Sequence, residues 1–395
     1  MSEKKRVVVA MSGGVDSAVA AGLLVRQGYD VVGITMRLWT RDDAEGRLHQ
    51  KRCCGVEDID DARAAAEVLG IPHYVLNLEE EFGRRVVDYF VSEYERGRTP
   101  NPCLACNEHV KFRALLDRAI AFDADYLSTG HYARVEAVDD GSFALRRAVD
   151  DDKDQSYVLY TLTQNELGRL LFPVGDFPKG QIRQLAFEMG MPLHDKPDSA
   201  EICFVPGNDY RAFLAERLPQ RPGAIVDQDG AVVGEHEGVA GFTIGQRKGL
   251  GAFGEKRFVT EINPTDNLIT IGDESDLLAR RLWAERASWV NGGPPADEFE
   301  ALVKVRYKSP AAPAIVRLRD GEIEVEFREP LRAITPGQAA VIYEGDRVVG
   351  GGIISRAVTE REAVATTAAI LPKMAKTANM PEISPTGRFK LQGDA

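Results

Sequence analysis

The stretch RVVVAMSGGVDS at residues 6–17 predicts a strand, a glycine-rich turn and the first turn of a helix. Its β-branched run, Arg6–Ala10, is typical of a buried strand in a parallel sheet. Gly13 and Gly14 allow backbone conformations closed to other residues and leave no Cβ in the way of an anion. Their N–H groups and the N-terminus of the following helix form a positively polarised concavity, so the stretch predicts a phosphate-binding loop.

The residues of this loop exclude two common kinds of phosphate-binding motif. The loop has neither the Gly-Lys-Ser/Thr of a Walker A motif nor the G-x-G-x-x-G of a dinucleotide turn. Ser12 and Ser17 add hydroxyl donors. Asp16 is a carboxylate beside a phosphate site, which suits either Mg²⁺ coordination or capping of the helix. The alternative is a strand–helix turn that merely requires glycine.

Strand and helix patterns alternate over the first two hundred residues. This alternation predicts an α/β fold with a parallel sheet and with ligands at the carboxyl ends of its strands. The expected strands are residues 6–10, 31–36, 73–78 and 125–128, and the expected helices are residues 16–27, 58–69, 81–95 and 109–122.

The pattern changes after about residue 203. Residues 223–233 and 258–271 each predict a hairpin, and the short strands that follow predict a small β-barrel. These strands are LVKVRY, AIVRLR, IEVEF, AAVIY and RVVGGGII. We therefore expect a nucleotide-binding domain over residues 1–207, a small mixed α+β domain over 208–281, a β-barrel over 282–358 and a poorly ordered tail over 359–395.

The composition is that of an ordinary globular protein. The chain has 395 residues, with 49 Lys and Arg against 61 Asp and Glu, which gives a formal net charge of −12. This acidity argues against non-specific coating of nucleic acid but not against a local basic surface. The longest apolar run, residues 18–25, is too short to span a bilayer, and the N-terminus lacks the features of a signal peptide. We expect a cytoplasmic chain with no membrane partner.

Five cysteines in a chain without an export signal do not predict a disulfide scaffold. Cys103 and Cys106 lie in the loop TPNPCLACN, which we expect to lead into a helix near His109. The N-terminal dipole of that helix favours the thiolate of Cys106. Cys203 follows in the segment DSAEICF, between the α/β region and the remainder of the chain.

Three kinds of chemistry compete for these cysteines. A zinc site would need Cys53 and Cys54 as its second pair of ligands, but these adjacent residues lack the required spacing. We therefore interpret Cys53 and Cys54 as structural residues that bind no metal. A thioredoxin-like pair lacks the appropriate strand order. Sulfur transfer through a persulfide uses exposed, acidic thiols on loops. An iron–sulfur cluster of the [4Fe-4S] type held by Cys103, Cys106 and Cys203 is a variant of the last interpretation.

The form S-G-G-x-D-S resembles the pyrophosphate loop of the PP-loop ATPases, which have an adenine nucleotide alpha-hydrolase-like domain and adenylate their substrates. With this loop and the motifs TPNPCLACN and SAEICF, the chain resembles the bacterial tRNA-specific 2-thiouridylases of the MnmA family. The likeness covers residues 5–355. It includes RCCGVEDIDDARAAAEVLGIPHYVLNL, STGHYA, DDKDQSYVLY, FTIGQRKGLG and VRYKSP.

The resemblance implies roles for individual residues. The ATP ligands would be Ala10, Met11, Ser12, Gly13, Gly14, Val15, Asp16, Ser17, Met36 and Gly130, with Mg²⁺ and a catalytic role for Asp16. Cys106 matches the nucleophile, and Cys203 matches the cysteine that carries the persulfide. The target base would meet Asn101, Pro102 and Cys103, and the remaining tRNA contacts would be His131, Lys153, Asp154, Gln155, Arg306, Tyr307 and Gln338.

The implied reaction is 2-thiolation of the wobble uridine in the tRNA anticodon loop. Adenylation of the uridine oxygen makes AMP the leaving group, and pyrophosphate is released. A persulfide on Cys203, loaded by a cysteine desulfurase or a sulfur-relay protein, then attacks, and a Cys106–Cys203 disulfide remains to be reduced. This chain departs from the family pattern at Cys103. Many members have Asp at this position, so a role assigned to that Asp cannot be carried over to Cys103.

Two other functions and two structural alternatives remain. The chain is alternatively a PP-loop ligase for a small metabolite, or a sulfur carrier or RNA-binding protein without catalysis. VRYKSP is alternatively a barrel strand with solvated charges, and the GQRKG segment at residues 245–249 is either a tRNA contact or a basic turn.

Overall fold

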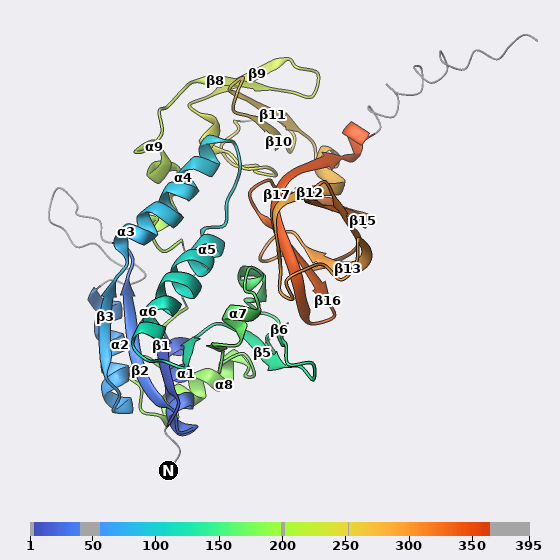
Figure 1. Cartoon of the computed structure of the whole chain (residues 1–395). Helices are drawn as coiled ribbons and strands as arrows, with labels where there is room; N and C mark the ends of the chain where they lie inside the picture. The colour runs from blue at the N-terminus through green and yellow to red at the C-terminus, as the bar shows by residue number, and fades with distance from the viewer. Residues whose placement is uncertain (1–3, 40–55, 199–201, 252, 364–395) are drawn as a thin grey trace, which may run out of the picture.

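The computed structural model describes residues 4–39, 56–198, 202–251 and 253–363 (Figure 1). The predicted structural cysteines Cys53 and Cys54, and all of the predicted tail beyond residue 363, lie outside these ranges. Within the described ranges, no helix has both the length and the apolar character needed to cross a membrane.

A five-stranded parallel sheet forms the first part of the chain, as predicted. Its strand order is β3-β2-β1-β4-β7. The strands are β1 (Arg6–Ala10), β2 (Asp30–Arg37), β3 (His73–Asn77), β4 (Tyr126–Thr129) and β7 (Leu170–Leu171). The first four coincide with the predicted strands to within one or two residues, whereas β7 was missed because two residues carry no periodicity.

Helices cover both faces of this sheet because β1 is apolar on both sides. Val7 and Val9 belong to one buried cluster, with α1 (Val15–Arg26), α2 (Val56–Leu69) and α8 (Lys179–Glu188). Val8 and Ala10 belong to the other cluster. On that face lie α3 (Glu79–Phe82), η1 (Gly83–Val87), α4 (Asp88–Glu95), α5 (Pro102–Ala105), η2 (Cys106–Ala114) and α6 (Leu115–Ala121).

The helix that carries Cys103 and Cys106 begins earlier than predicted. Helix α5 starts at Pro102 and continues through η2 into α6, so the expected start near His109 is wrong. Asn101 is the N-cap, and its Oδ1 accepts a hydrogen bond of 3.0 Å from the backbone N–H of Cys103. Asn followed by Pro is a signal for a helix start, because Asn caps and Pro needs no donor at the first position.

The central part contains a four-stranded sheet of order β10-β11-β8-β9. Both predicted hairpins are confirmed, since β8 pairs with β9 and β10 with β11 in antiparallel fashion. The elements are α9 (Tyr210–Ala215), β8 (Gly223–Val226), β9 (Val232–His236), β10 (Phe258–Asn263) and β11 (Leu268–Gly272), with short turns η4 (Pro206–Asn208), η5 (Val239–Gly241) and η6 (Ser275–Leu277).

Six antiparallel strands close into the predicted C-terminal barrel. They follow the order β12-β15-β14-β13-β16-β17, and β12 pairs with β17 to complete the ring. The strands are β12 (Leu278–Trp289), β13 (Glu298–Lys304), β14 (Ala312–Arg319), β15 (Glu322–Arg332), β16 (Ala339–Glu344) and β17 (Arg347–Thr359). Strand β13 ends at Lys304, so Arg306 and Tyr307 lie in the turn that follows it. The interpretation of VRYKSP as a barrel strand is therefore wrong.

A hairpin from the first part of the chain extends the sheet of this barrel. Its strands β5 and β6 pair with each other, and β6 pairs with β17. The hairpin and the segments that follow it are β5 (Ala133–Ala137), β6 (Phe143–Arg147), η3 (Ser156–Leu159) and α7 (Gln164–Leu167). The sequence analysis did not predict this pairing, which joins segments about two hundred residues apart.

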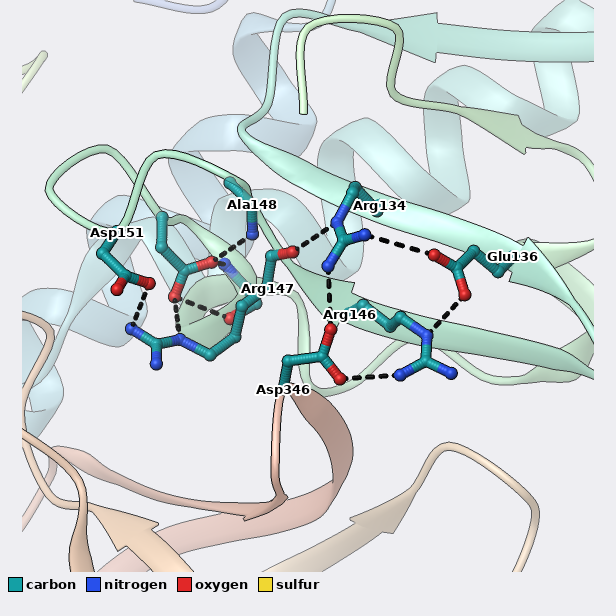
Figure 2. A network of polar contacts seen from close by, with 9 residues as sticks. Arg134, Glu136, Arg146, Arg147, Ala148, Asp151 and Asp346 are labelled. Atoms are coloured by element: carbon teal, nitrogen blue, oxygen red, sulfur yellow. Dashed lines mark hydrogen bonds and ion pairs between the residues drawn. The ribbon is translucent and has the colours of Figure 1, made fainter. Parts of the chain in front are cut away.

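Ion pairs hold the hairpin to the barrel (Figure 2). Asp346, in the turn before β17, accepts from Arg134 Nη2 at 2.8 Å and from Arg146 Nη1 at 2.6 Å. Glu136 bridges the same two guanidinium groups, at 3.2 Å and 2.6 Å. Because charges of both signs alternate around this ring, each guanidinium faces a carboxylate on two sides, and the hairpin is fixed to β17.

Candidate active site

The phosphate loop lies between β1 and α1, as predicted, and its shape depends on glycine. Gly13 has a φ of +71°, and a Cβ on it would lie 2.2 Å from the carbonyl oxygen of Asp58. Ser17 closes the loop, since its Oγ accepts from the N–H of Ser12 at 3.1 Å and donates to the carbonyl oxygen of Gly14 at 3.0 Å. The Ser17 hydroxyl, expected to face a phosphate, is therefore engaged within the loop.

The other predicted nucleotide residues surround this loop at the carboxyl edge of the sheet. Gly130, directly after β4, packs so closely on α1 that a Cβ would lie 2.6 Å from the N atom of Ser17. Ala10 is the last residue of β1, and Met36 is the last but one residue of β2. Met11 is buried, and its carbonyl oxygen accepts a hydrogen bond of 2.7 Å from Thr35 Oγ1. Because Met11 and Val15 are buried, they would meet a nucleotide chiefly through their main chain.

Asp16 has two partners that the sequence analysis missed. Its Oδ1 accepts a hydrogen bond of 2.7 Å from the hydroxyl of Tyr132 and one of 2.6 Å from Nζ of Lys179. Burial and the nearby Asp16 carboxylate raise the pKa of Tyr132, which therefore donates as a neutral phenol. Tyr132 belongs to STGHYA and Lys179 opens α8 after a proline, but neither position signals contact with a residue more than a hundred positions earlier.

The three described cysteines differ in exposure. Cys103 is exposed in the first turn of the helix, Cys106 is 7% exposed, and Cys203 is intermediate. Cys106 belongs to the apolar cluster that contains Ala10 and Met36, and Cys203 packs against the same cluster, together with Tyr307. The two cysteines predicted to act in sulfur transfer thus contact the same hydrophobic cluster as the ends of β1 and β2.

The structure does not support two of the implied states of these cysteines. Within the described ranges, Cys106 and Cys203 are not joined by a disulfide. The same part of the chain contains no group of three or more His, Cys, Asp or Glu residues arranged to hold a metal ion. The described residues therefore give no support to the [4Fe-4S] ligand set of Cys103, Cys106 and Cys203 that the sequence left open.

Tyr307 connects the barrel to the predicted base-binding residues. Burial, Asp154 and the Cys103 side chain raise the pKa of Tyr307, whereas a hydrogen bond with Gln155 acts in the opposite direction. The ring also lies 6.1 Å from that of Tyr157. Cys103, Gln155 and Tyr307, predicted from three distant motifs, are thus brought together.

Other predicted tRNA residues have structural partners. Asp154 is buried and accepts hydrogen bonds from the N–H groups of Ala148 and Ser156, each at 3.1 Å. Gln155 Oε1 accepts from the N–H of Tyr132 at 3.0 Å. Lys153 Nζ donates to Asp198 at 2.9 Å. These residues of the motif DDKDQSYVLY therefore make hydrogen bonds within the protein.

His131 is also buried. Its Nδ1 lies 2.6 Å from Oγ1 of Thr129, and its ring packs against Phe112 and Phe172. Burial, with a smaller effect of Lys111, lowers its pKa well below 6.5, so the ring is neutral at physiological pH. Placed in this way, His131 supports the end of β4 beside Gly130.

The last two predicted tRNA residues connect the barrel to other parts of the chain, Arg306 to the central part and Gln338 to the first part. Arg306 donates to the carbonyl oxygens of Ile244 and Ala333 at 3.3 Å and 2.7 Å, and burial lowers its pKa. Gln338 Nε2 donates to the carbonyl oxygen of Thr99 at 2.7 Å. Gln338 thus ties the barrel to the segment just before Asn101 and Cys103.

Comparison with known proteins decides the family. Residues 5–207 match the family described as tRNA methyl transferase HUP domain, residues 211–273 the tRNA methyl transferase PRC-barrel domain, and residues 279–354 the aminomethyltransferase beta-barrel domain. A protein of Carboxydothermus hydrogenoformans named tRNA-specific 2-thiouridylase MnmA is 49% identical over 358 residues, covering 89% of this chain and 98% of that protein. The chain belongs to the tRNA-specific 2-thiouridylase MnmA family.

Other MnmA relatives agree. The MnmA of Lachnoclostridium phytofermentans is 47% identical over 354 residues, covering 89% of this chain and 99% of that protein. That of Clostridium perfringens is 48% identical over 355 residues, with 89% and 98% covered. The predicted family and enzyme class, a tRNA sulfurtransferase, are confirmed, and so is the predicted fold of an α/β domain, a small middle domain and a β-barrel.

Proposed function

We propose that the chain transfers sulfur to the 2-position of the wobble uridine in tRNA anticodons, with ATP as the activating substrate. One observation carries the proposal: Cys106 and the ends of β1 and β2 belong to one apolar cluster, against which Cys203 and Tyr307 pack. A base that enters between Cys103 and Tyr307 has the phosphate loop and both sulfur-bearing residues around the same core. The names of the MnmA relatives support tRNA as the substrate.

The first step is adenylation. The uridine O2 attacks the α-phosphorus of ATP, a new O–P bond forms, the bond to pyrophosphate breaks, and the base loses its N3 proton. Mg²⁺ arrives with ATP as part of the substrate, and a carboxylate such as Asp16 has the oxygen donors that this ion prefers. The loop N–H groups and Lys179, 2.6 Å from Asp16, supply positive charge where pyrophosphate departs.

The second step is sulfur transfer. The terminal sulfur of a persulfide on Cys203 attacks C2 of the base, and AMP leaves with the former O2. The Cys106 thiolate then attacks the inner sulfur, which forms the Cys106–Cys203 disulfide and leaves the electron pair of the broken S–S bond on the thiouridine. An external thiol must reduce the disulfide, and a cysteine desulfurase or relay protein must reload Cys203.

The persulfide route requires two cysteines, and the cluster route requires three. Cys103 is exposed in the helix and Cys106 is buried, which suits separate roles for these two thiols better than shared coordination of iron. We therefore assign Cys103 to the base-binding surface, together with Asn101 and Pro102.

Substitution of the assigned residues tests the function. Cys106→Ser and Cys203→Ser should each lower 2-thiouridine to the detection limit of nucleoside mass spectrometry, in a reaction with tRNA, ATP and a sulfur donor. Asp16→Ala should stop thiolation while tRNA binding and persulfide loading persist. Exposed Asp117 on α6 offers the matched control, and Asp117→Ala should leave thiolation unchanged.

Three outcomes would contradict the assignment. Wild-type thiolation by either cysteine variant would remove that cysteine from the reaction, and full thiolation by Asp16→Ala would refute adenylation at this loop. ATP–pyrophosphate exchange that is independent of tRNA but requires a small metabolite would point instead to a PP-loop ligase.

A further inference from the structure

Lys304 is a half-buried lysine whose amine lies over two aromatic rings at the proposed site. It is the last residue of β13, between Val303 and Val305, whose side chains are buried in the barrel core. Because side chains alternate along a strand, that of Lys304 points out of the barrel. Its Nζ lies 5.9 Å from the centre of the Tyr157 ring and 5.7 Å from that of Tyr307.

The Tyr157 ring is a fixed support for this amine. Tyr157 is fully buried, and its hydroxyl donates to the carbonyl oxygen of Ala339 at 2.9 Å and accepts from the N–H of the same residue at 3.1 Å. Cys103 lies near the second ring, Tyr307. Since we place the target base between Cys103 and Tyr307, the amine of Lys304 lies beside the position assigned to that base.

The carboxylates near Lys304 are already engaged by other groups. Asp154 is buried and accepts from Arg147 Nε at 3.3 Å and from Ser156 Oγ at 2.9 Å, in addition to two backbone N–H groups. Asp151 accepts from Arg147 Nη2 at 3.1 Å (Figure 2). Among the residues that the structure describes, none forms a hydrogen bond or an ion pair with the Lys304 amine.

The environment of Lys304 therefore favours the binding of an anion. Burial lowers the pKa of this amine, and the opposing effect of Asp154 does not restore it. A lowered pKa means that the folded protein stabilises the ammonium form less well than water does. A phosphate oxygen that accepts from the amine would reverse this effect, because a charge-assisted hydrogen bond favours the charged form.

The phosphates on either side of the target uridine are the anions that enter with the base. A base that leaves the anticodon stack remains joined to one phosphate on its 5′ side and to one on its 3′ side. An amine already held over two rings loses little side-chain freedom when it binds such a group. A contact at this position would hold the extruded nucleotide itself, and not the base-paired stem.

We propose that Lys304 binds a phosphate that flanks the target uridine and thereby holds the extruded nucleotide beside Tyr307. The proposal rests on the proposed function, because it requires a tRNA whose target base is bound between Cys103 and Tyr307. It deepens that function in naming the residue that recognises the RNA backbone where the base leaves the stack.

Lys304→Met tests the contact, because it removes the charge and keeps a long apolar side chain over the two rings. Binding of tRNA is measured by filter binding at several salt concentrations, with Mg²⁺ and α,β-methylene-ATP present. The variant should raise the Kd for tRNA about tenfold. It should also reduce the slope of log Kd against log salt by about 0.7–0.9, the change expected for one phosphate. Lys304→Arg keeps the charge and should retain most of the slope.

Lys5→Met is the matched control. Lys5 also lies over a tyrosine ring, at 5.2 Å from the centre of Tyr126, but it directly precedes β1 and so lies at the opposite edge of the sheet from the phosphate loop. This variant should bind tRNA with the wild-type Kd and salt slope.

A second measurement locates the phosphate. In tRNA ligated from synthetic segments, an uncharged methylphosphonate replaces the phosphate on the 5′ or the 3′ side of the target uridine. The wild type should lose affinity for one of these two tRNAs. Lys304→Met should bind that tRNA and unmodified tRNA equally, since the two changes remove the same contact.

Two results would overturn the proposal. One is a Lys304→Met variant with the wild-type Kd and salt slope. The other is a variant that binds tRNA normally but has a lower kcat for thiolation, because Lys304 would then act on the base and not on the backbone. If the variant does not fold, as judged by thermal melting, equal affinity of the wild type for modified and unmodified tRNA overturns the proposal. A wild type that binds no tRNA would instead refute the proposed function, and this contact with it.

Discussion

At the scale of single residues, burial decides what His131 does. The sequence places it after Thr129 and Gly130 at a strand end, where the family resemblance implies contact with tRNA. In the structure the ring packs against both Phe112 and Phe172, and burial keeps it neutral. A buried neutral ring opposes protonation, so its contribution to stability depends on pH in a definite direction.

His131→Gln tests that direction. Because burial lowers the folded-state pKa, the unfolded state binds more protons below pH 6.5. The stabilisation from His131 is therefore complete above pH 6.5 and is lost as the pH falls towards the folded pKa. In urea unfolding at pH 7.5 and 5.5, the free-energy difference between wild type and variant should shrink by up to about 1.4 kcal/mol at the lower pH. An equal difference at both values would show that the ring is protonated alike in both states.

At the scale of elements, the helix cap at Asn101 sets the position of two cysteines. The Asn101 side chain satisfies the N–H of Cys103, and Pro102 fills the first helical position. The helix therefore starts at Pro102, with exposed Cys103 in the first turn and buried Cys106 in the second. The spacing of three residues along a helix, and not a flexible loop, separates these thiols.

Asn101 caps the helix and is also assigned to the base-binding surface, and two substitutions separate these two roles. Asn101→Ala removes the cap and should lower the free energy of unfolding by about 1 kcal/mol. Asn101→Asp keeps an acceptor for the Cys103 N–H and should retain most of the stability. If Asn101 also faces the target base, both variants should lose thiolation, measured by nucleoside mass spectrometry. Full stability of Asn101→Ala in urea unfolding would show that the cap is dispensable.

At the scale of the whole molecule, the barrel holds the segment that leads to the cysteines. The N–H of Thr99 donates to the carbonyl oxygen of Pro336 at 2.8 Å, and Gln338 donates back to the carbonyl oxygen of Thr99. Between them Gly337 has a φ of +93°, and a Cβ there would lie 2.9 Å from the Thr99 backbone. The barrel and the segment before Asn101 thus meet through one main-chain hydrogen bond and one from the Gln338 side chain, and the close approach at Gly337 leaves no space for a side chain there.

Gly337→Ala should disturb this junction. The strained φ and the close Cβ should together cost about 1–3 kcal/mol of stability, seen as a lower melting temperature in calorimetry. Thiolation should fall because Asn101 and Cys103 shift, while binding of α,β-methylene-ATP persists because the phosphate loop lies in another part of the site. Gly293→Ala is the matched control, since a Cβ at Gly293 meets nothing within 4 Å. Equal melting temperatures for the two variants would argue against the junction.

Local patterns predicted most of the elements but not the way they join. The β-branched run of β1, Gly13 and the spacing within α1 are signals contained in adjacent residues, and the structure agrees with them. The start of α5 was also indicated by two adjacent residues, Asn101 and Pro102. The sequence analysis missed it because two prolines suggested a loop. The pairing of β6 with β17 had no local signal, because strand partners far apart in sequence are selected by packing.

The sequence by itself determined the glycine-rich loop, most strands of the sheet and barrel, and the family, because each depends on residue types at short, fixed spacing. Only the tertiary structure decided which side chains surround Asp16. Tyr132 and Lys179 reach it from 116 and 163 positions away. No local propensity encodes such contacts, because they form only when β4, α8 and the phosphate loop pack against one another and bury their charges together.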